Sequence, residues 1–158
     1  MPLLRLAMFF LACLSVASAM AADDSHSGYY YPKPQTREVY VSQLKNLPTA
    51  GKRTRIGFTV GLNSQQQRKA YAPGYHIFAK GAEAEKLIIV GVRSGHYNTL
   101  FRLRALLASL SADARTSNLF RTLKEPESTN FLDLCKLTGF TQVTLSDGDK
   151  IAHRILLP

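Results

Sequence analysis

Lys86-Leu87-Ile88-Ile89-Val90-Gly91-Val92 is the stretch that decides the fold. Its centre is apolar on both faces and rich in β-branched residues, which is typical of a strand in the middle of a sheet. Residues 75–80 (YHIFAK) predict a neighbouring strand, joined to the first around the turn-forming segment 81–84. The chain is therefore expected to be built around a sheet.

Further upstream, two segments carry weaker signals. Residues 55–62 alternate apolar side chains with small or polar ones, which predicts a third strand with one buried face. Residues 36–47 predict a short helix that Pro48 ends. The segment 29–34 (YYYPKP) is rich in tyrosine and proline, so we expect an extended arm. Its three tyrosines either drape over the domain or bind a partner.

Downstream, two helices are expected. The first begins at Asn98 as N-cap and runs to about residue 114. It is apolar on two sides, so we expect it to be covered on two sides. The second helix, residues 129–138, places Cys135 on its apolar face, and Gly139 supplies a left-handed cap.

The chain ends in a predicted hairpin. A three-residue loop of Ser146, Asp147 and Gly148 would pair Val143 with Ile151 and put Gly148 in the left-handed position. In this register His153 pairs with Thr141 and lies on the same face as Val143 and Leu145. A core or edge histidine is therefore a better interpretation than a catalytic one.

These elements together predict an α+β fold, with a mainly antiparallel sheet of about five strands and two or three helices on one face. Residues 51–158 form the single domain, and residues 22–50 form the arm with its short helix.

The first 21 residues predict a secretory signal. Arg5 precedes an apolar run, and a small-residue cleavage site ends near Ala19 or Ala21, so the mature chain is expected to start at Met20 or Ala22. An uncleaved anchor or a lipoprotein is the alternative. Cleavage implies a periplasmic or secreted protein, with no transmembrane segment left.

Charge and cysteine content limit the chemistry. The 158-residue chain carries 20 lysines and arginines against 11 aspartates and glutamates, and the mature chain without Arg5 remains strongly basic. Cys135 is then the only cysteine, so no internal disulfide forms. The histidine spacing predicts no metal site, and no phosphate-binding glycine loop or cofactor motif is present.

Two groups of residues are candidates for function. The first group consists of basic side chains together with the tyrosines of the arm, and it suits an anionic envelope component or an acidic protein surface. After export, nucleic acid is not expected as a partner. A catalytic alternative uses His96, Tyr97 and Lys80. The candidate binding residues are Lys52, Arg53, Arg55, Arg68, Lys69, Tyr29, Tyr30 and Tyr31.

Four segments, 28–32 (GYYYP), 77–84 (IFAKGAEA), 104–108 (RALLA) and 145–149 (LSDGD), resemble a group of small exported proteobacterial proteins of uncharacterised function. Some members are labelled molybdopterin-guanine dinucleotide biosynthesis protein A. The label implies a nucleotidyltransferase, but this chain has no amino-terminal glycine-rich loop with a following arginine and lysine. No functional residue is therefore transferred.

Two functions follow as hypotheses. The first is an exported, non-enzymatic binding or interaction module with a basic surface. The second is a small envelope enzyme acting near His96, Tyr97 and Lys80, or a role in molybdopterin-guanine dinucleotide biosynthesis as the label implies. A concave site that gathers His96, Lys80 and a carboxylate would favour the enzyme.

Overall fold

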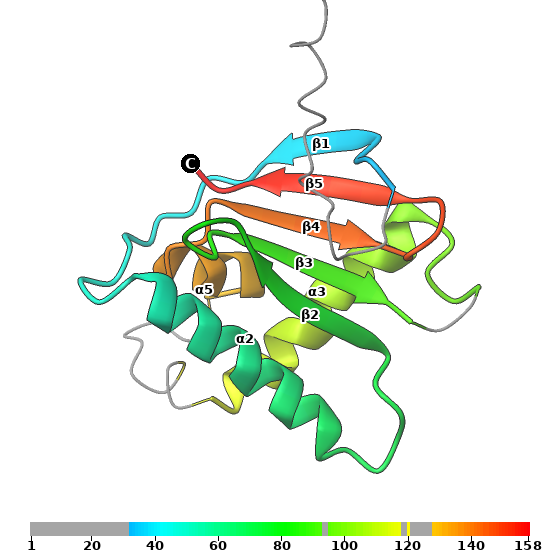
Figure 1. Ribbon diagram of the computed structural model, residues 1–158, viewed down its shortest axis with the longest axis horizontal. Coiled ribbons are helices and arrows are strands. Elements are labelled where there is room, and N and C mark those ends of the chain that lie inside the picture. The colour runs from blue at the N-terminus through cyan, green and yellow to red at the C-terminus, as the bar shows by residue number, and fades with distance from the viewer. Residues whose placement is uncertain (1–31, 93–94, 118–119, 121–127) are drawn as a thin grey trace, which may run out of the picture.

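The computed structural model describes residues 32–92, 95–117, 120 and 128–158, which fold into one sheet with helices packed against it (Figure 1). None of the helices in this part of the chain is both long enough and apolar enough to cross a membrane. The elements in chain order are β1 (Thr36–Val39), α2 (Lys52–Gln67), β2 (Tyr75–Lys80), β3 (Lys86–Gly91), α3 (Leu100–Arg115), α5 (Phe131–Leu137), β4 (Gln142–Ser146) and β5 (Ala152–Leu156).

The five strands lie in the order β1-β5-β4-β3-β2. The pairs β2/β3 and β4/β5 are antiparallel, whereas β3/β4 and β1/β5 are parallel. The α+β class is confirmed, but the expectation of a mainly antiparallel sheet is wrong because the sheet is mixed. The reason is the crossover through α3 and α5, which brings the chain back to start β4 at the same edge as β3.

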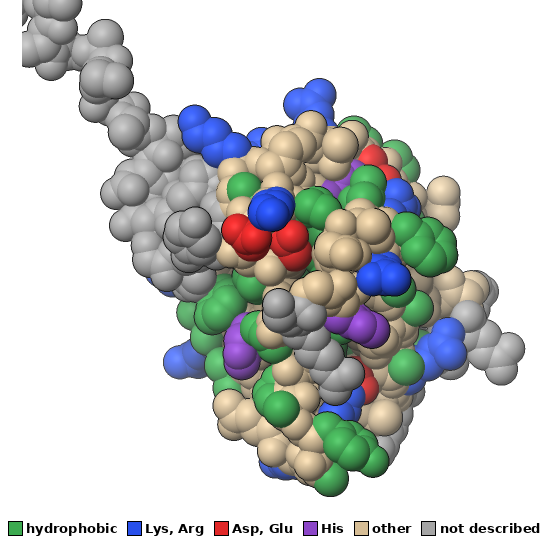
Figure 2. Space-filling model, turned by 90° about the vertical axis from the view of Figure 1, so that its right-hand side faces the viewer, with side chains coloured by type: hydrophobic (Ala, Val, Ile, Leu, Met, Phe, Trp, Pro, Cys, Tyr) green, Lys and Arg blue, Asp and Glu red, His purple; other side chains and the backbone are tan. Residues whose placement is uncertain are grey.

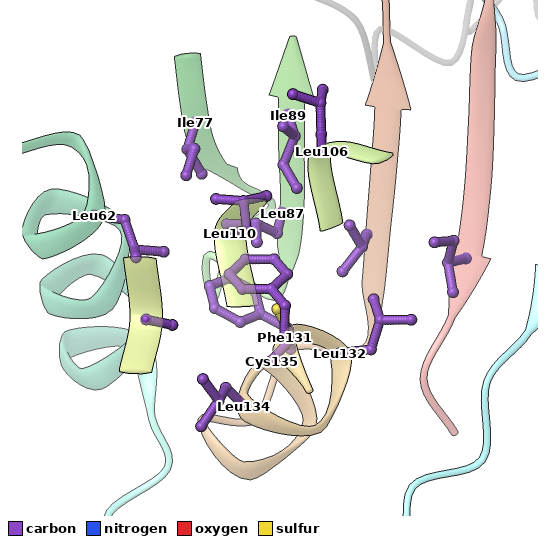
Figure 3. Close-up of a cluster of buried hydrophobic side chains, with 14 of the residues drawn as sticks. Leu62, Ile77, Leu87, Ile89, Leu106, Leu110, Phe131, Leu132, Leu134 and Cys135 are labelled. Carbon is purple, nitrogen blue, oxygen red and sulfur yellow. The ribbon is translucent and has the colours of Figure 1, made fainter. Parts of the chain in front are cut away.

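The hydrophobic core lies between the sheet and the helices, which all cover the same face (Figure 3). Strand β3 is central, as predicted, since Leu87, Ile88 and Ile89 are each at most 1% exposed. Leu87 and Ile89 meet side chains from α3 and α5, among them Leu110 and Phe131.

The predicted strand over residues 55–62 is wrong, because this segment lies within helix α2. Its apolar alternation does not mark one buried face: Ile56 and Val60 are exposed, by 43% and 56%, whereas Leu62 is buried. The buried side chains recur with helical spacing and are mostly polar, so hydropathy did not reveal the period. They are Arg55, Thr59, Leu62 and Gln66.

The predicted helix over residues 36–47 is also wrong, because its first residues form the edge strand β1. The chain is fixed beside β5 by Gln35, whose backbone N–H donates to the Ala152 carbonyl at 3.0 Å. The Gln35 side-chain oxygen also accepts the Ala152 N–H at 2.8 Å. Pairing with a strand more than 100 residues later outweighs the local helical pattern.

Helix α3 begins one residue later than predicted, and its N-cap is Thr99 rather than Asn98: the Thr99 hydroxyl accepts the Arg102 N–H at 3.3 Å. Leu103, Leu106 and Leu110 are buried, as the main apolar side requires. The second side is not covered, because Phe101 is 84% exposed. Its small apolar area does not need burial, since single exposed apolar side chains are common.

The C-terminal hairpin differs from the predicted register. Strand pairing ends at Ser146 and Ala152, so the connection has five residues instead of three, and His153 pairs with Leu145 rather than Thr141. The wider turn forms because the Asp147 carboxylate accepts backbone N–H groups from the three residues 149–151. Gly148 does take the left-handed conformation, with φ of 78°.

Helix α5 agrees with prediction in its two key features. Cys135 is fully buried, and Gly139 after the helix has φ of 88°, the left-handed cap. Asn130 and Asp133 form a reciprocal capping box at the start of the helix.

Candidate functional site

A cleft of about 570 Å³ lies at the carboxyl ends of the parallel strands β3 and β4. Loops that follow adjacent parallel strands meet at one edge of a sheet, where ligand sites of such sheets are found. One wall is the loop after β3, with Tyr97 and Asn98, and the other wall is the turn after β4, from Asp147 to Lys150.

Tyr97 is the central side chain of this region. Its ring lies so close over Gly91 that a Cβ there would collide with it, so glycine is required at this position. The His96 ring meets the Tyr97 ring edge-on, with 4.8 Å between centroids. His96 is exposed, and no described residue hydrogen-bonds to its imidazole.

On the other side of Tyr97, a second hollow of about 500 Å³ runs along α3. Arg102 stands at its rim, where its guanidinium donates to the Asn98 side-chain oxygen at 3.1 Å and to the Gly95 carbonyl at 3.4 Å. Because Gly95 and Tyr97 line both hollows, the two hollows form one continuous concave region.

The carboxylates of this region come from the β4–β5 turn. Burial alone would raise the pKa of Asp147, but the backbone N–H groups of Ile151, Asp149 and Lys150 outweigh burial and hold that pKa below its ordinary value. These bonds occupy Asp147, whereas Asp149 and Lys150 are exposed beside it. Figure 2 views this end of the molecule and shows acidic, basic and histidine side chains mixed on it.

Lys80 lies at the opposite end of the sheet from His96 and Tyr97. Tyr75 pairs with Gly91 and Lys80 pairs with Lys86, so Lys80 is five residues, or roughly 17 Å, from the cleft edge. Tyr97 therefore shares the cleft with Asp147 and Asp149, and His96 lines the adjoining hollow, whereas Lys80 lies at the other end of the sheet.

Among the basic candidates, Arg55 is a buried structural residue, only 8% exposed. Its Nε and Nη2 donate to the Glu83 carbonyl at 2.9 and 2.7 Å, and its Nη1 donates to the Gly139 carbonyl at 3.2 Å. It therefore ties α2 to the β2–β3 turn and to the cap of α5, and its charge is not on the surface.

Lys52 and Arg53 are exposed at the start of α2 and join a group that we call the basic end: Lys45, Lys52, Arg53 and Lys136. Helix α5 and the start of α2 lie on the left in Figure 1. The segment before α2 is held against α5, since the Leu47 N–H donates to the Leu137 carbonyl at 2.8 Å. No described carboxylate forms an ion pair with any of the four. Sequence reasoning missed Lys136, because only this tertiary contact brings it near Lys52.

Arg68 and Lys69 follow the other end of α2, which at 16 residues is about 24 Å long, so they are not part of the basic end. Lys69 forms an ion pair with Asp113 at 2.7 Å. Tyr75 donates to the same carboxylate at 2.7 Å, and burial, followed by this hydrogen bond, raises the pKa of Tyr75.

The described carboxylates are mostly engaged inside the molecule. The described residues include 16 lysines and arginines against 7 aspartates and glutamates, hence a balance of +9. Five of the seven accept hydrogen bonds or ion pairs from the protein itself: Glu38, Glu85, Asp113, Asp133 and Asp147. The ion pairs of lysine or arginine among the described residues include Lys69 with Asp113 and Arg104 with Glu38.

The remaining candidates, Tyr29, Tyr30 and Tyr31, lie outside the described residues, as does the expected signal segment 1–21. The described part of the chain holds no group of three or more histidine, cysteine, aspartate or glutamate side chains placed to hold a metal. No family model, curated protein or solved structure matches this chain.

Proposed function

We propose that this protein is an exported binding module that holds an anionic component of the cell envelope at its basic end. The observation that carries the proposal is the asymmetry of pairing: five of the seven described carboxylates are engaged internally, whereas Lys45, Lys52, Arg53 and Lys136 have no ion pair with a described residue. Unpaired charges of one sign produce a field that attracts the opposite sign.

Vesicles test the proposal directly. The mature protein should bind vesicles that contain phosphatidylglycerol and not vesicles of phosphatidylcholine alone. Raising the salt concentration from roughly 0.01 M to 0.15 M shortens the Debye length from about 30 Å to about 8 Å and should release most of the protein.

Charge reversal locates the surface. Lys52→Glu with Arg53→Glu should abolish retention at low salt, because both side chains belong to the basic end. The matched control, Arg68→Glu with Lys150→Glu, changes the net charge equally at exposed positions elsewhere. If both double variants lose binding equally, net charge rather than the basic end is responsible. Arg55 is left unchanged, since its substitution would disturb folding.

Export has its own test. Mass spectrometry of the protein recovered from the periplasm or medium should show a chain that begins at Met20 or Ala22. An intact Arg5 in that fraction would contradict the signal-peptide interpretation.

The concave region around Tyr97 supports a second candidate function, that of a small envelope enzyme, because His96 lines one of its hollows and the exposed residue Asp149 lines the other. A general base needs a partner that orients it, and His96 has no hydrogen bond with a described residue. Lys80 is at the far end of the sheet. These two facts favour the binding module over the enzyme and over the nucleotidyltransferase role.

A further inference from the structure

Helix α2 carries two exposed aliphatic side chains next to the basic end. Ile56 and Val60 are about half exposed, and because they are four residues apart they are neighbours on the helix surface. Gly57 and Gly61 lie beside them, and a Cβ at either glycine would stand in open space. The two aliphatic side chains therefore project beyond the helix surface around them.

The packing of α2 does not use these side chains. The helix lies at the periphery of the molecule (Figure 1) and packs against β2 and α3. The residues that it buries recur with helical spacing on another side of the helix: Arg55, Thr59, Leu62 and Gln66. Ile56 and Val60 are thus available for contact with another surface.

The same part of the chain contains no acidic residue. Residues 39–82 include seven lysines and arginines but no aspartate or glutamate. Lys52 and Arg53 begin α2, about one turn before Ile56, and both are exposed. Cations beside projecting aliphatic side chains complement the interface of an anionic bilayer, where charged headgroups lie directly over acyl chains.

A bilayer suits this surface better than a polysaccharide or another protein does. An anionic polysaccharide would bind the two cations but leave Ile56 and Val60 in water. A stable protein interface needs a complementary surface of about 800 Å² on each partner, whereas a fluid bilayer adapts to side chains that project. Arg53 and Val60 are about 10 Å apart along the helix axis, so one patch of membrane can contact the cations and the aliphatic side chains together.

We propose that the start of α2 docks on an anionic phospholipid bilayer, with Lys52 and Arg53 at the phosphate headgroups and Ile56 and Val60 inserted among the upper acyl chains. This inference rests on the proposed function and identifies its anionic component as the bilayer. The cations attract the protein from a distance, and the aliphatic side chains add adhesion at short range. Because only two side chains insert, the attachment is peripheral and reversible.

Tryptophan fluorescence tests the insertion, because the chain contains no tryptophan of its own. In Val60→Trp, emission should shift to shorter wavelength when the mature protein binds phosphatidylglycerol vesicles at low salt, and lipids brominated on their acyl chains should quench it. The matched control is Phe101→Trp on α3. Phe101 is 84% exposed, so its tryptophan should remain in water and keep its emission.

A second test removes the aliphatic side chains and keeps every charge. Ile56→Ser with Val60→Ser should weaken binding to these vesicles by about tenfold, since complete burial of one such side chain shifts an equilibrium by roughly tenfold or more. The matched control is Val39→Ser with Val41→Ser, which removes two exposed valines at and just after β1. This control should bind as the unsubstituted protein does.

Three results would overturn the inference. The first is Val60→Trp that binds the vesicles without a spectral shift or quenching, and the second is full affinity in Ile56→Ser with Val60→Ser. In both cases, loss of binding in Lys52→Glu with Arg53→Glu would leave the proposed function standing. The third is retention on dextran sulfate, an anionic polysaccharide, but not on the vesicles, which also spares the proposed function. Absence of binding to both ligands would refute the proposed function as well.

Discussion

Substitution of Arg55 by alanine should destabilise the protein more than the same substitution of any exposed basic residue. A hydrogen bond from a charged donor contributes about 1.5–3 kcal/mol. Arg55 donates three such bonds, but two share the carbonyl of Glu83, an exposed residue that water can reach after the change. Counting these two as one and adding the buried bond to Gly139 gives an expected loss of about 3–6 kcal/mol.

The assay is equilibrium unfolding in urea, with thermal unfolding as a second measure. For a domain of this size, 1 kcal/mol corresponds to about 3–5 °C in Tm, so Arg55→Ala should lower Tm by about 10–30 °C. Arg55→Lys keeps the charge but has one nitrogen, so it should lose about half as much. The control is Arg53→Ala, an exposed neighbour expected to change stability by at most about 0.5 kcal/mol. Equal effects of Arg55→Ala and Arg53→Ala would refute the role assigned to Arg55.

Two further predictions concern the reactivity of the Cys135 thiol and the dependence of stability on acid pH. Cys135 should resist a thiol reagent in the native protein and react after denaturation, because burial, with a smaller contribution from Asp133, raises the pKa of its thiol; rapid native labelling would contradict this. The folded-state pKa of Asp147 lies below the unfolded value of about 3.9, so its stabilising effect is complete above that pH and is lost as the pH falls through the folded pKa. Asp147→Asn should therefore reduce stability at neutral pH but not near pH 2, and an equal loss at both would show that the charge is not involved.

Local signals in the sequence were reliable where the side chains that decide an element lie within it. The run at Leu87 to Val90 identified the central strand, because a strand that is apolar on both faces is stable only inside a sheet. Gly139 and Gly148 marked left-handed positions, because their conformations depend on turns a few residues long. The burial of Cys135 followed from the apolar face of a short helix in the same way.

In the candidate site, sequence reasoning was reliable for residues that are neighbours in the chain and failed for residues that are far apart in it. His96 and Tyr97 are neighbours in sequence, so their common location was predictable. Lys80 was grouped with them without knowledge of the strand register, and the register places it at the other end of the sheet. Lys136 was not considered, because its approach to the start of α2 depends on the contact of Leu47 with α5.

By itself, the sequence determined an α+β fold, its central strand, its basic character and the burial of its cysteine, since these depend on composition and on short-range patterns. Tertiary structure alone decided that the sheet is mixed, that residues 36–39 form a strand, and that α2 is a helix. In α2 the buried face is polar, and Arg55 and Gln66 are stable there only because distant carbonyl and carboxylate groups accept their hydrogen bonds. No local pattern contains those acceptors, which is why the segment could not be interpreted from its own residues.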